Sequence, residues 1–140
     1  MTPDVDLQIA IFSALNASLE LAEAMGDEVR VYDRVPGGSP RQEPRLPYIT
    51  SNAGQALDDG DTCEPDRFEV YQELHVWSDA VGMLEAKEIA GIIRDVLLTP
   101  FPVNNWNLQI ADWQGTRHEP DPDRITTHSI VTFRFVLDPA

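Results

Sequence analysis

Residues 70–98 read VYQELHVWSDAVGMLEAKEIAGIIRDVLL, and the spacing of the apolar residues changes partway through this stretch. Apolar and polar residues alternate over residues 68–77, which is the period of a β-strand with one buried face. Over residues 86–97 the apolar residues recur every three or four positions, which is the period of an amphipathic helix. The pair Ser78-Asp79 lies at the change, where side-chain oxygens can cap a helix start, and Thr99-Pro100 marks a stop. The stretch therefore predicts a long strand followed by a helix that packs back on it.

The same two periods predict the rest of the fold. Thr2-Pro3-Asp4 has the composition of a helix start, and Gly26 is a natural helix stop. We expect the buried stripe of this helix to comprise Val5, Ile9, Phe12, Leu15 and Leu19, widened by Leu7, Ile11 and Leu21. Further alternating runs predict strands at residues 29–32, 47–50 and 106–111, and the strongest such run predicts a strand at 125–137. The order predicts an α+β fold in one domain of residues 1–140, with two helices on one face of a largely antiparallel sheet of about four to five strands.

Polar segments separate these elements. Residues 36–44 are rich in proline and glycine and predict an exposed loop that extends to Leu46. Residues 51–65 are acidic and follow neither period, so we expect a long mobile loop there. The run EPDPD at residues 119–123 predicts a hinge before the last strand. In the first loop, Arg41 and Arg45 are available to pair with acidic groups on a partner.

Composition excludes several classes of protein. The chain carries a formal net charge of −14, with ten Lys and Arg against 24 Asp and Glu. Clustered cations are what binds phosphate, so a nucleic-acid-binding or membrane-surface protein is not expected. No window approaches the roughly 20 apolar residues of a membrane-spanning helix, and Asp4 and Asp6 stand where a secretion signal needs positive charge. We therefore expect a protein that is made and kept in cytoplasm-like conditions.

Candidates for catalysis are few. Cys63 is the only cysteine, and together with His75, His118 or His128 it could form a nucleophile and base. However, Cys63 lies among carboxylates, which suppress the reactive thiolate, and no oxyanion turn accompanies it. We therefore expect no catalytic residue and no enzyme activity.

Metal sites are equally weakly supported. The run DDGD at residues 58–61 lacks the glycine and glutamate spacing of a calcium loop, so a solvated acidic loop is the simpler explanation. His75 and His128 lie on two predicted strands and could face each other as metal ligands, but the sequence places no third ligand. We expect neither a metal ion nor a cofactor.

The sheet face that points away from the helices is expected to be unusually apolar. Its aromatic and branched residues are Tyr71, Trp77, Ile130 and Val136, with Trp113 as a further candidate. Apolar patches of this kind tend to mark contact surfaces, so this face is our candidate for an interface between subunits. One of the three tryptophans is expected in the core instead.

Five segments carry a resemblance to a known family. They are VYDRVP at residues 31–36, LPYI at 46–49 and HVWSD at 75–79, followed by the pairs at 85–86 and 89–90. In these segments the chain resembles the tail terminator proteins of long-tailed phages, also called tail completion or tail-to-head joining proteins. Phage-like gene transfer agents carry similar chains. The resemblance extends from the first helix to the last strand.

The resemblance implies a structural protein of the virion, located at the head-tail interface after assembly in the host cytoplasm. It implies a homohexameric ring on the head-proximal end of the tail tube, which ends tube growth and joins tail to head. The implied partners are other copies of the chain, the major tail tube protein and the head-tail connector, while DNA passes through the lumen without specific binding. A head completion or connector ring protein of the same particle remains an alternative. A small dimeric α+β ligand-binding domain or enzyme is a more distant one.

Overall fold

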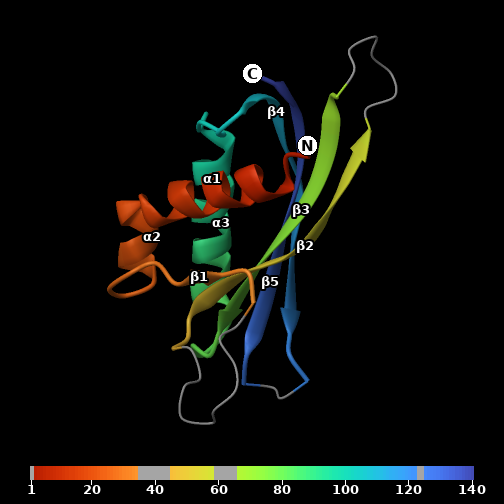
Figure 1. Cartoon of the computed structure of the whole chain (residues 1–140). Coiled ribbons are helices and arrows are strands. Elements are labelled where there is room, and N and C mark those ends of the chain that lie inside the picture. Colours follow the sequence, from red (N-terminus) through yellow and green to blue (C-terminus); the bar gives the residue numbers. More distant parts are fainter. Residues whose placement is uncertain (1, 35–44, 59–65, 123–124) are drawn as a thin grey trace.

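The computed structural model describes residues 2–34, 45–58, 66–122 and 125–140. Within these ranges the elements are α1 (Asp4–Asn16), α2 (Leu19–Ala24), β1 (Val31–Tyr32), β2 (Tyr48–Asp58), β3 (Phe68–Ser78), α3 (Leu84–Leu98), β4 (Trp106–Pro120) and β5 (Thr127–Pro139). The described strands form one five-stranded sheet in the order β1-β2-β3-β5-β4, antiparallel except for the short β1–β2 pair. Figure 1 shows the helices on one side of this sheet. The predicted α+β fold is confirmed, with a third helix, α2, in addition to the two expected.

The stretch that ends β3 and begins α3 follows the predicted order but not the predicted boundary. α3 begins at Leu84, several residues after Ser78. The hydroxyl of Ser78 accepts a hydrogen bond from the backbone N–H of Ala80 (3.2 Å) and donates one to the carboxylate of Glu85 (2.8 Å). Ser78 therefore fixes the connection between strand and helix rather than capping the helix. The helix ends at Leu98 with Thr99 as its C-terminal cap, at the predicted stop.

The core lies between α3 and the facing side of the sheet. α3 buries one stripe of side chains, namely Ala86, Ile89, Ala90, Ile92, Ile93 and Leu97. The sheet contributes alternate residues of its two central strands, namely Val70, Leu74, Val76, Val131, Phe133, Phe135 and Leu137. Each fully buried side chain of this type stabilises the fold by roughly 1.5–3 kcal/mol. The predicted strand and helix periods are thus confirmed where they were clearest.

The first helical region differs from the prediction in two ways. It is broken at Ser18, whose hydroxyl caps α2 by accepting a hydrogen bond from the N–H of Leu21 (3.2 Å). It also buries only part of the predicted stripe: Leu7, Ile11 and Leu15 are buried as expected, together with Ala10. Val5, Ile9 and Leu19, expected in the core, are 70%, 58% and 82% exposed. The expected hydroxyl cap at Thr2 is absent too, because Pro3 is the cap residue and no side-chain bond is made there.

Two strands are longer than the sequence predicts, and both contain bulges. β2 continues to Asp58, so the prediction of a loop is wrong for residues 51–58, while residues 59–65 lie outside the described part. Its pairing with β3 shifts between residues 52 and 55. β4 continues to Pro120 and shifts between 108 and 110 and again between 113 and 115. Each bulge inserts a residue and breaks the alternation that identifies a strand.

A buried arginine holds the start of the sheet to the end of the helices. Arg30 is only 6% exposed. Its Nε donates to the carbonyl oxygens of Arg45 (3.1 Å) and Pro47 (3.0 Å), and its Nη2 donates to that of Met25 (3.0 Å). Its Nη1 pairs with the carboxylate of Asp27 at 2.6 Å. One guanidinium therefore joins three chain segments beside the β1–β2 pair, a role that no sequence pattern indicates.

Candidate interaction surfaces

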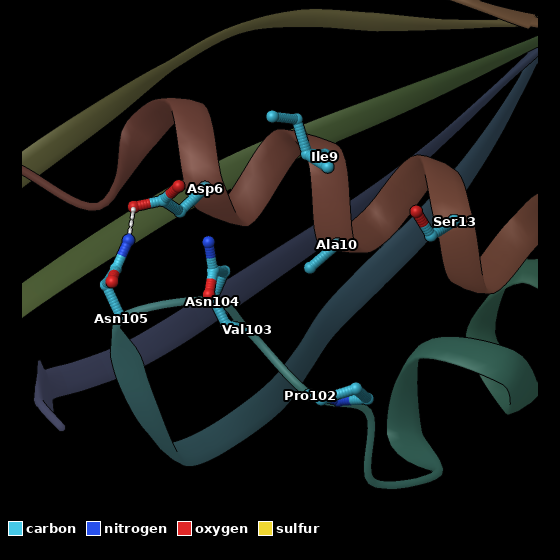
Figure 2. Close-up of a pocket in the computed structure, with 8 residues that line it drawn as sticks. All are labelled: Asp6, Ile9, Ala10, Ser13, Pro102, Val103, Asn104 and Asn105. Atoms are coloured by element: carbon cyan, nitrogen blue, oxygen red, sulfur yellow. Dashed lines mark hydrogen bonds between the residues drawn. The ribbon is translucent and has the colours of Figure 1, made fainter.

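A groove of about 460 Å³ separates α1 from the segment before β4 (Figure 2). It is lined by Asp6, Ile9, Ala10, Ser13 and residues 102–105. Asp6 lies at one end, where its carboxylate accepts hydrogen bonds from Nδ2 of Asn105 (3.5 Å) and from Nε1 of Trp106 (3.2 Å). Figure 2 shows Ala10 directed toward the 102–105 segment, whereas Ile9 points away from it. The groove thus holds a carboxylate that is already paired, beside a helix face that leaves Ile9 exposed.

A second surface lies at the far end of β4, and we call it the end patch. It consists of Val81, Leu84 and Ile125, which are 104%, 79% and 70% exposed. A hollow of about 430 Å³ lies here between the β3–α3 connection and the β4–β5 turn. The hydroxyl of Thr127 donates to the carbonyl oxygen of Gly82 (3.4 Å) and joins the two segments. Exposed apolar side chains gathered in this way are typical of contact surfaces.

The sequence prediction missed the end patch. Ile125 was expected to begin the last strand, but β5 begins two residues later, at Thr127. Val81 and Leu84 precede the helical period, which begins at residue 86, and the sequence pattern makes no prediction for them. The signal in the sequence was Gly82 itself, which has a φ of 81° in the structure, a backbone conformation that glycine adopts without steric cost and that is typical of a turn.

The sheet face away from the helices carries a cluster of rings at one end. Trp77 stacks on His128, with ring centroids 3.8 Å apart and planes 11° apart. Nδ1 of His75 contacts Nε2 of His128 directly, and Nε2 of His75 donates to the carboxylate of Glu73 (3.0 Å). Nε1 of Trp77 donates to the hydroxyl of Thr50 (3.2 Å). The cluster therefore spans β2, β3 and β5 and fixes Trp77 in place.

An ionic group occupies the other end of the same face. Arg134 donates to Glu69 through Nε (2.9 Å) and Nη2 (2.8 Å). The pKa of Glu69 is lowered, first by a hydrogen bond from Tyr71 and then by Arg134. The same hydrogen bond to Glu69, together with burial, raises the pKa of Tyr71. Tyr71 is thus half-buried and engaged within its own chain.

The prediction that this face exposes its branched side chains is wrong for two residues. Ile130 is 5% exposed and Val136 is fully buried, although neither belongs to the main core cluster. Val136 lies between Glu69 of β3 and Ile110 of β4 in the strand register, so long neighbouring side chains flank it on the sheet. Side chains buried in this way pack within the sheet and leave little exposed area for contact with another subunit.

The remaining predicted positions have separate outcomes. Trp113 lies on the helix side of the sheet, where the guanidinium of Arg94 on α3 sits 4.7 Å from its ring centroid, so it is not on the far face. Trp106 is the core tryptophan, at 4% exposure. Arg45 is largely exposed and pairs with the carboxylate of Asp27 (2.7 Å). Arg41 lies outside the described residues, so its expected role stays a prediction.

The described residues hold no arrangement that performs chemistry. Nδ1 of His118 lies 2.7 Å from the hydroxyl of Ser129, but Ser129 is fully buried and cannot meet a substrate. Burial, and then the charge of Lys87, lower the pKa of His118. Cys63 lies outside the described part of the chain. In the ranges that the structure covers, no three His, Cys, Asp or Glu side chains are grouped to hold a metal ion.

Among the described residues, none of the helices is long and apolar enough to span a bilayer.

Comparison with known proteins bears on the whole chain. A sequence model of the family described as "Tail completion protein gp17" matches residues 9–138. A chain of the solved structure described as "Virion of native gene transfer agent (GTA) particle" superimposes with a TM-score of 0.78 over 96% of each chain, at 21% sequence identity. At this identity the likeness shows a common fold. The comparison with curated proteins found no significant match. Because the family match covers nearly the whole length, the chain belongs to the tail completion protein gp17 family, a family of structural virion proteins and not of enzymes, and is a structural component of a phage-type tail.

Proposed function

We propose that the protein is a tail terminator, which forms a ring at the head-proximal end of the tail tube, stops tube growth and joins tail to head. The observation that carries this proposal is the family match over residues 9–138, which leaves only short ends of the chain outside it. The likeness to a chain of a gene transfer agent virion supports the same fold, at 21% identity. We further propose that residues 1–140 act as one domain and that six copies form the ring.

The physical basis of termination is the capping of a repeated interface. A tube grows by repeating one heterologous contact, so a subunit with one matching end and one different end stops growth. The groove is lined by residues 102–105, which come just before the start of β4. The hollow of the end patch is lined in part by Pro120, the last residue of β4. Two chemically distinct surfaces thus lie at opposite ends of a 15-residue strand, and this supports a subunit with two different axial partners. The proposed partners are the major tail tube protein and the head-tail connector.

Contacts between copies require a surface with little charge, because the chain carries a net charge of −14. The end patch consists of the exposed apolar residues Val81, Leu84 and Ile125, and Asp79 also lines the hollow beside it. We propose that it packs against the neighbouring copy in the ring, since its exposed apolar area would otherwise face water. Trp77 and Tyr71, both half-buried, extend the proposed contact along the sheet face.

The acidic balance is compatible with a lumen through which DNA passes without specific binding. Like charge between the wall and the phosphates opposes adhesion. The same net negative charge also favours solubility, so it is an argument for a DNA-conducting lumen only if the protein forms a ring.

Measurement of the purified protein by light scattering and electron microscopy tests the ring. We expect a ring-shaped oligomer with a hole wide enough for duplex DNA. A compact monomer or dimer would contradict the ring and would favour the ligand-binding alternative.

Two variants test the contact itself. Val81→Asp and Ile125→Asp place a charge in the end patch and should reduce the oligomer to smaller species with an unchanged circular dichroism spectrum. Leu19→Asp is the matched control, because Leu19 is 82% exposed and is the first residue of α2, which starts near the C-terminal end of α3, whereas Leu84 is at its N-terminal end. Normal rings from both patch variants would show that the end patch makes no subunit contact.

A further inference from the structure

The groove beside α1 continues past the hollow drawn in Figure 2. A second hollow, of about 290 Å³, follows along the same helix and is lined by Ala14, Ala17, Ser18, Val96 and residues 99–101. Ser13 and Ala14 are consecutive on the helix, and Phe101 and Pro102 are consecutive on the segment opposite, so the two hollows adjoin. Together they form one depression along α1, which we call the α1 groove.

The α1 groove offers apolar contact area that stands open to solvent. Its α1 wall carries the small side chains Ala10 and Ala14, and Phe101 lies on the opposite wall. Ile9 lines it and is 58% exposed, while Val5, one turn earlier on the helix, is 70% exposed. Branched side chains of a surface helix usually face the core, and their exposure here favours a contact with another chain.

Both ends of the α1 groove favour positive charge. At one end the hydrogen bonds from Asn105 and Trp106 both reach Oδ2 of Asp6, which leaves Oδ1 for a further donor. At the other end lie Ala17 and Thr99, the C-terminal caps of α1 and α3. A helix C-terminus carries partial negative charge and has carbonyl oxygens without an intrahelical partner. Neither of these two helices has a basic residue in its last turn, and none of the described residues that line the groove is Lys or Arg.

The length of the α1 groove fits a short extended segment. From Asp6 to Ala17 the helix rises by about 17 Å, at 1.5 Å per residue. An extended chain covers this distance in about five residues. Asn104 is exposed, and Figure 2 shows its side chain directed toward α1. Its amide can donate to and accept from the backbone of such a segment.

We propose that the α1 groove binds an extended, apolar segment of another protein of the particle, with a Lys or Arg side chain at each end. The apolar side chains of that segment cover Ile9 and Ala14. One cation donates to Oδ1 of Asp6, and the other donates to the carbonyl oxygens at the ends of α1 and α3. A second copy of the chain is a poorer occupant, because each copy carries a net charge of −14 and like charges repel across an interface. The groove thereby serves one of the two axial partners of the proposed function, on which this assignment rests.

Photo-cross-linking in assembled particles tests the identity of the occupant. Ser13 is exposed and lines the groove, so p-benzoyl-phenylalanine at this position lies beside whatever binds there. Glu23 is the matched control position, because it is exposed on α2 and does not line the groove. After irradiation, mass spectrometry identifies the joined peptides. We expect position 13 to join a segment of another particle protein in which Lys or Arg flanks apolar residues, and position 23 to give no such product.

A bulky side chain in the groove gives a second readout. Ser13→Trp fills the groove, whereas Glu23→Trp adds the same side chain outside it. Both purified variants should keep the circular dichroism spectrum and the oligomer size of the wild type. Only Ser13→Trp should lose one axial junction in electron micrographs, seen either as tails detached from heads or as tubes without a terminated end.

Four results would each overturn the assignment of the α1 groove. They are a cross-link from position 13 to another copy of the chain, a cross-link to a segment without Lys or Arg, a yield no higher than that from position 23, and normal particles with Ser13→Trp. Each of them concerns the groove alone. The terminator role is judged separately, by the length of the tails made without the protein.

Discussion

Replacing Arg30 by Met should destabilise the protein strongly. The change removes the guanidinium that donates to the carbonyl oxygens of Met25, Arg45 and Pro47, at 3.0–3.1 Å. Methionine fills a similar volume but has no donor, and Arg30 is 6% exposed, so water does not readily replace the lost bonds. The three carbonyl oxygens then lose their charged partner in a buried place.

The magnitude follows from these three bonds. A net contribution of about 1 kcal/mol for each gives a loss of about 3 kcal/mol, within a range of roughly 2–4 kcal/mol. The charged donor raises this value, and the relief of a buried cation lowers it. Against a total stability of about 5–15 kcal/mol the loss is large. With a urea m-value of about 1–3 kcal/mol/M, the unfolding midpoint should fall by about 1–3 M.

Urea unfolding followed by circular dichroism measures this change. Arg45→Met is the control, because the Arg45 side chain is 70% exposed and its pair with Asp27 is a surface pair, so its midpoint should stay near that of the wild type. Arg30→Lys should lie between the two, since lysine keeps the charge but not the planar set of donors. Equal midpoints for Arg30→Met and Arg45→Met would refute the role assigned to Arg30.

Two further predictions concern stability. Gly54→Ala should lower the free energy of unfolding by about 1–3 kcal/mol, because the added Cβ would lie 2.5 Å from the carbonyl oxygen of Tyr71. Gly91→Ala adds a Cβ with no atom within 4 Å and should stabilise α3 by about 0.5–1 kcal/mol. Urea unfolding should therefore show changes of opposite sign for the two variants. Because burial holds the folded pKa of His128 below its ordinary 6.5, the unfolded chain takes up more protons as pH falls below that value, and stability should decline from about pH 7 to pH 5. His128→Gln should reduce this decline in melting temperature without removing it, since the pKa of His118 is lowered too; an unchanged slope would contradict the assignment.

The sequence predicted those parts of the fold in which one period dominates. β3 and α3 could be predicted from residues 68–77 and 86–97, because in each stretch the spacing of the apolar residues places them on one face of the element. β2 and β4 were predicted too short because bulges at residues 52–55 and 113–115 interrupt the alternation, and a bulge becomes visible only through the partner strand. The far ends of these strands are fixed by pairing with β3 and β5.

The exposed surfaces were the least predictable part. α1 has apolar residues on two sides, and packing against α3 selects the stripe with Leu7 and Leu15 over the one with Val5 and Ile9. On the opposite sheet face, Val136 is buried among side chains whose placement depends on the register of three strands. Contact between His75 and His128 was foreseen only as one option, since it requires the observed β3–β5 register.

The length of the tails made without this protein tests the central claim most directly. A producing strain that lacks the protein should accumulate headless tail tubes of uncontrolled length in electron micrographs, and supplying the wild-type chain should restore tails of one length joined to heads. Tails of normal length without the protein would contradict its role as terminator. If such normal tails were also detached from heads, the result would favour the alternative of a head completion protein.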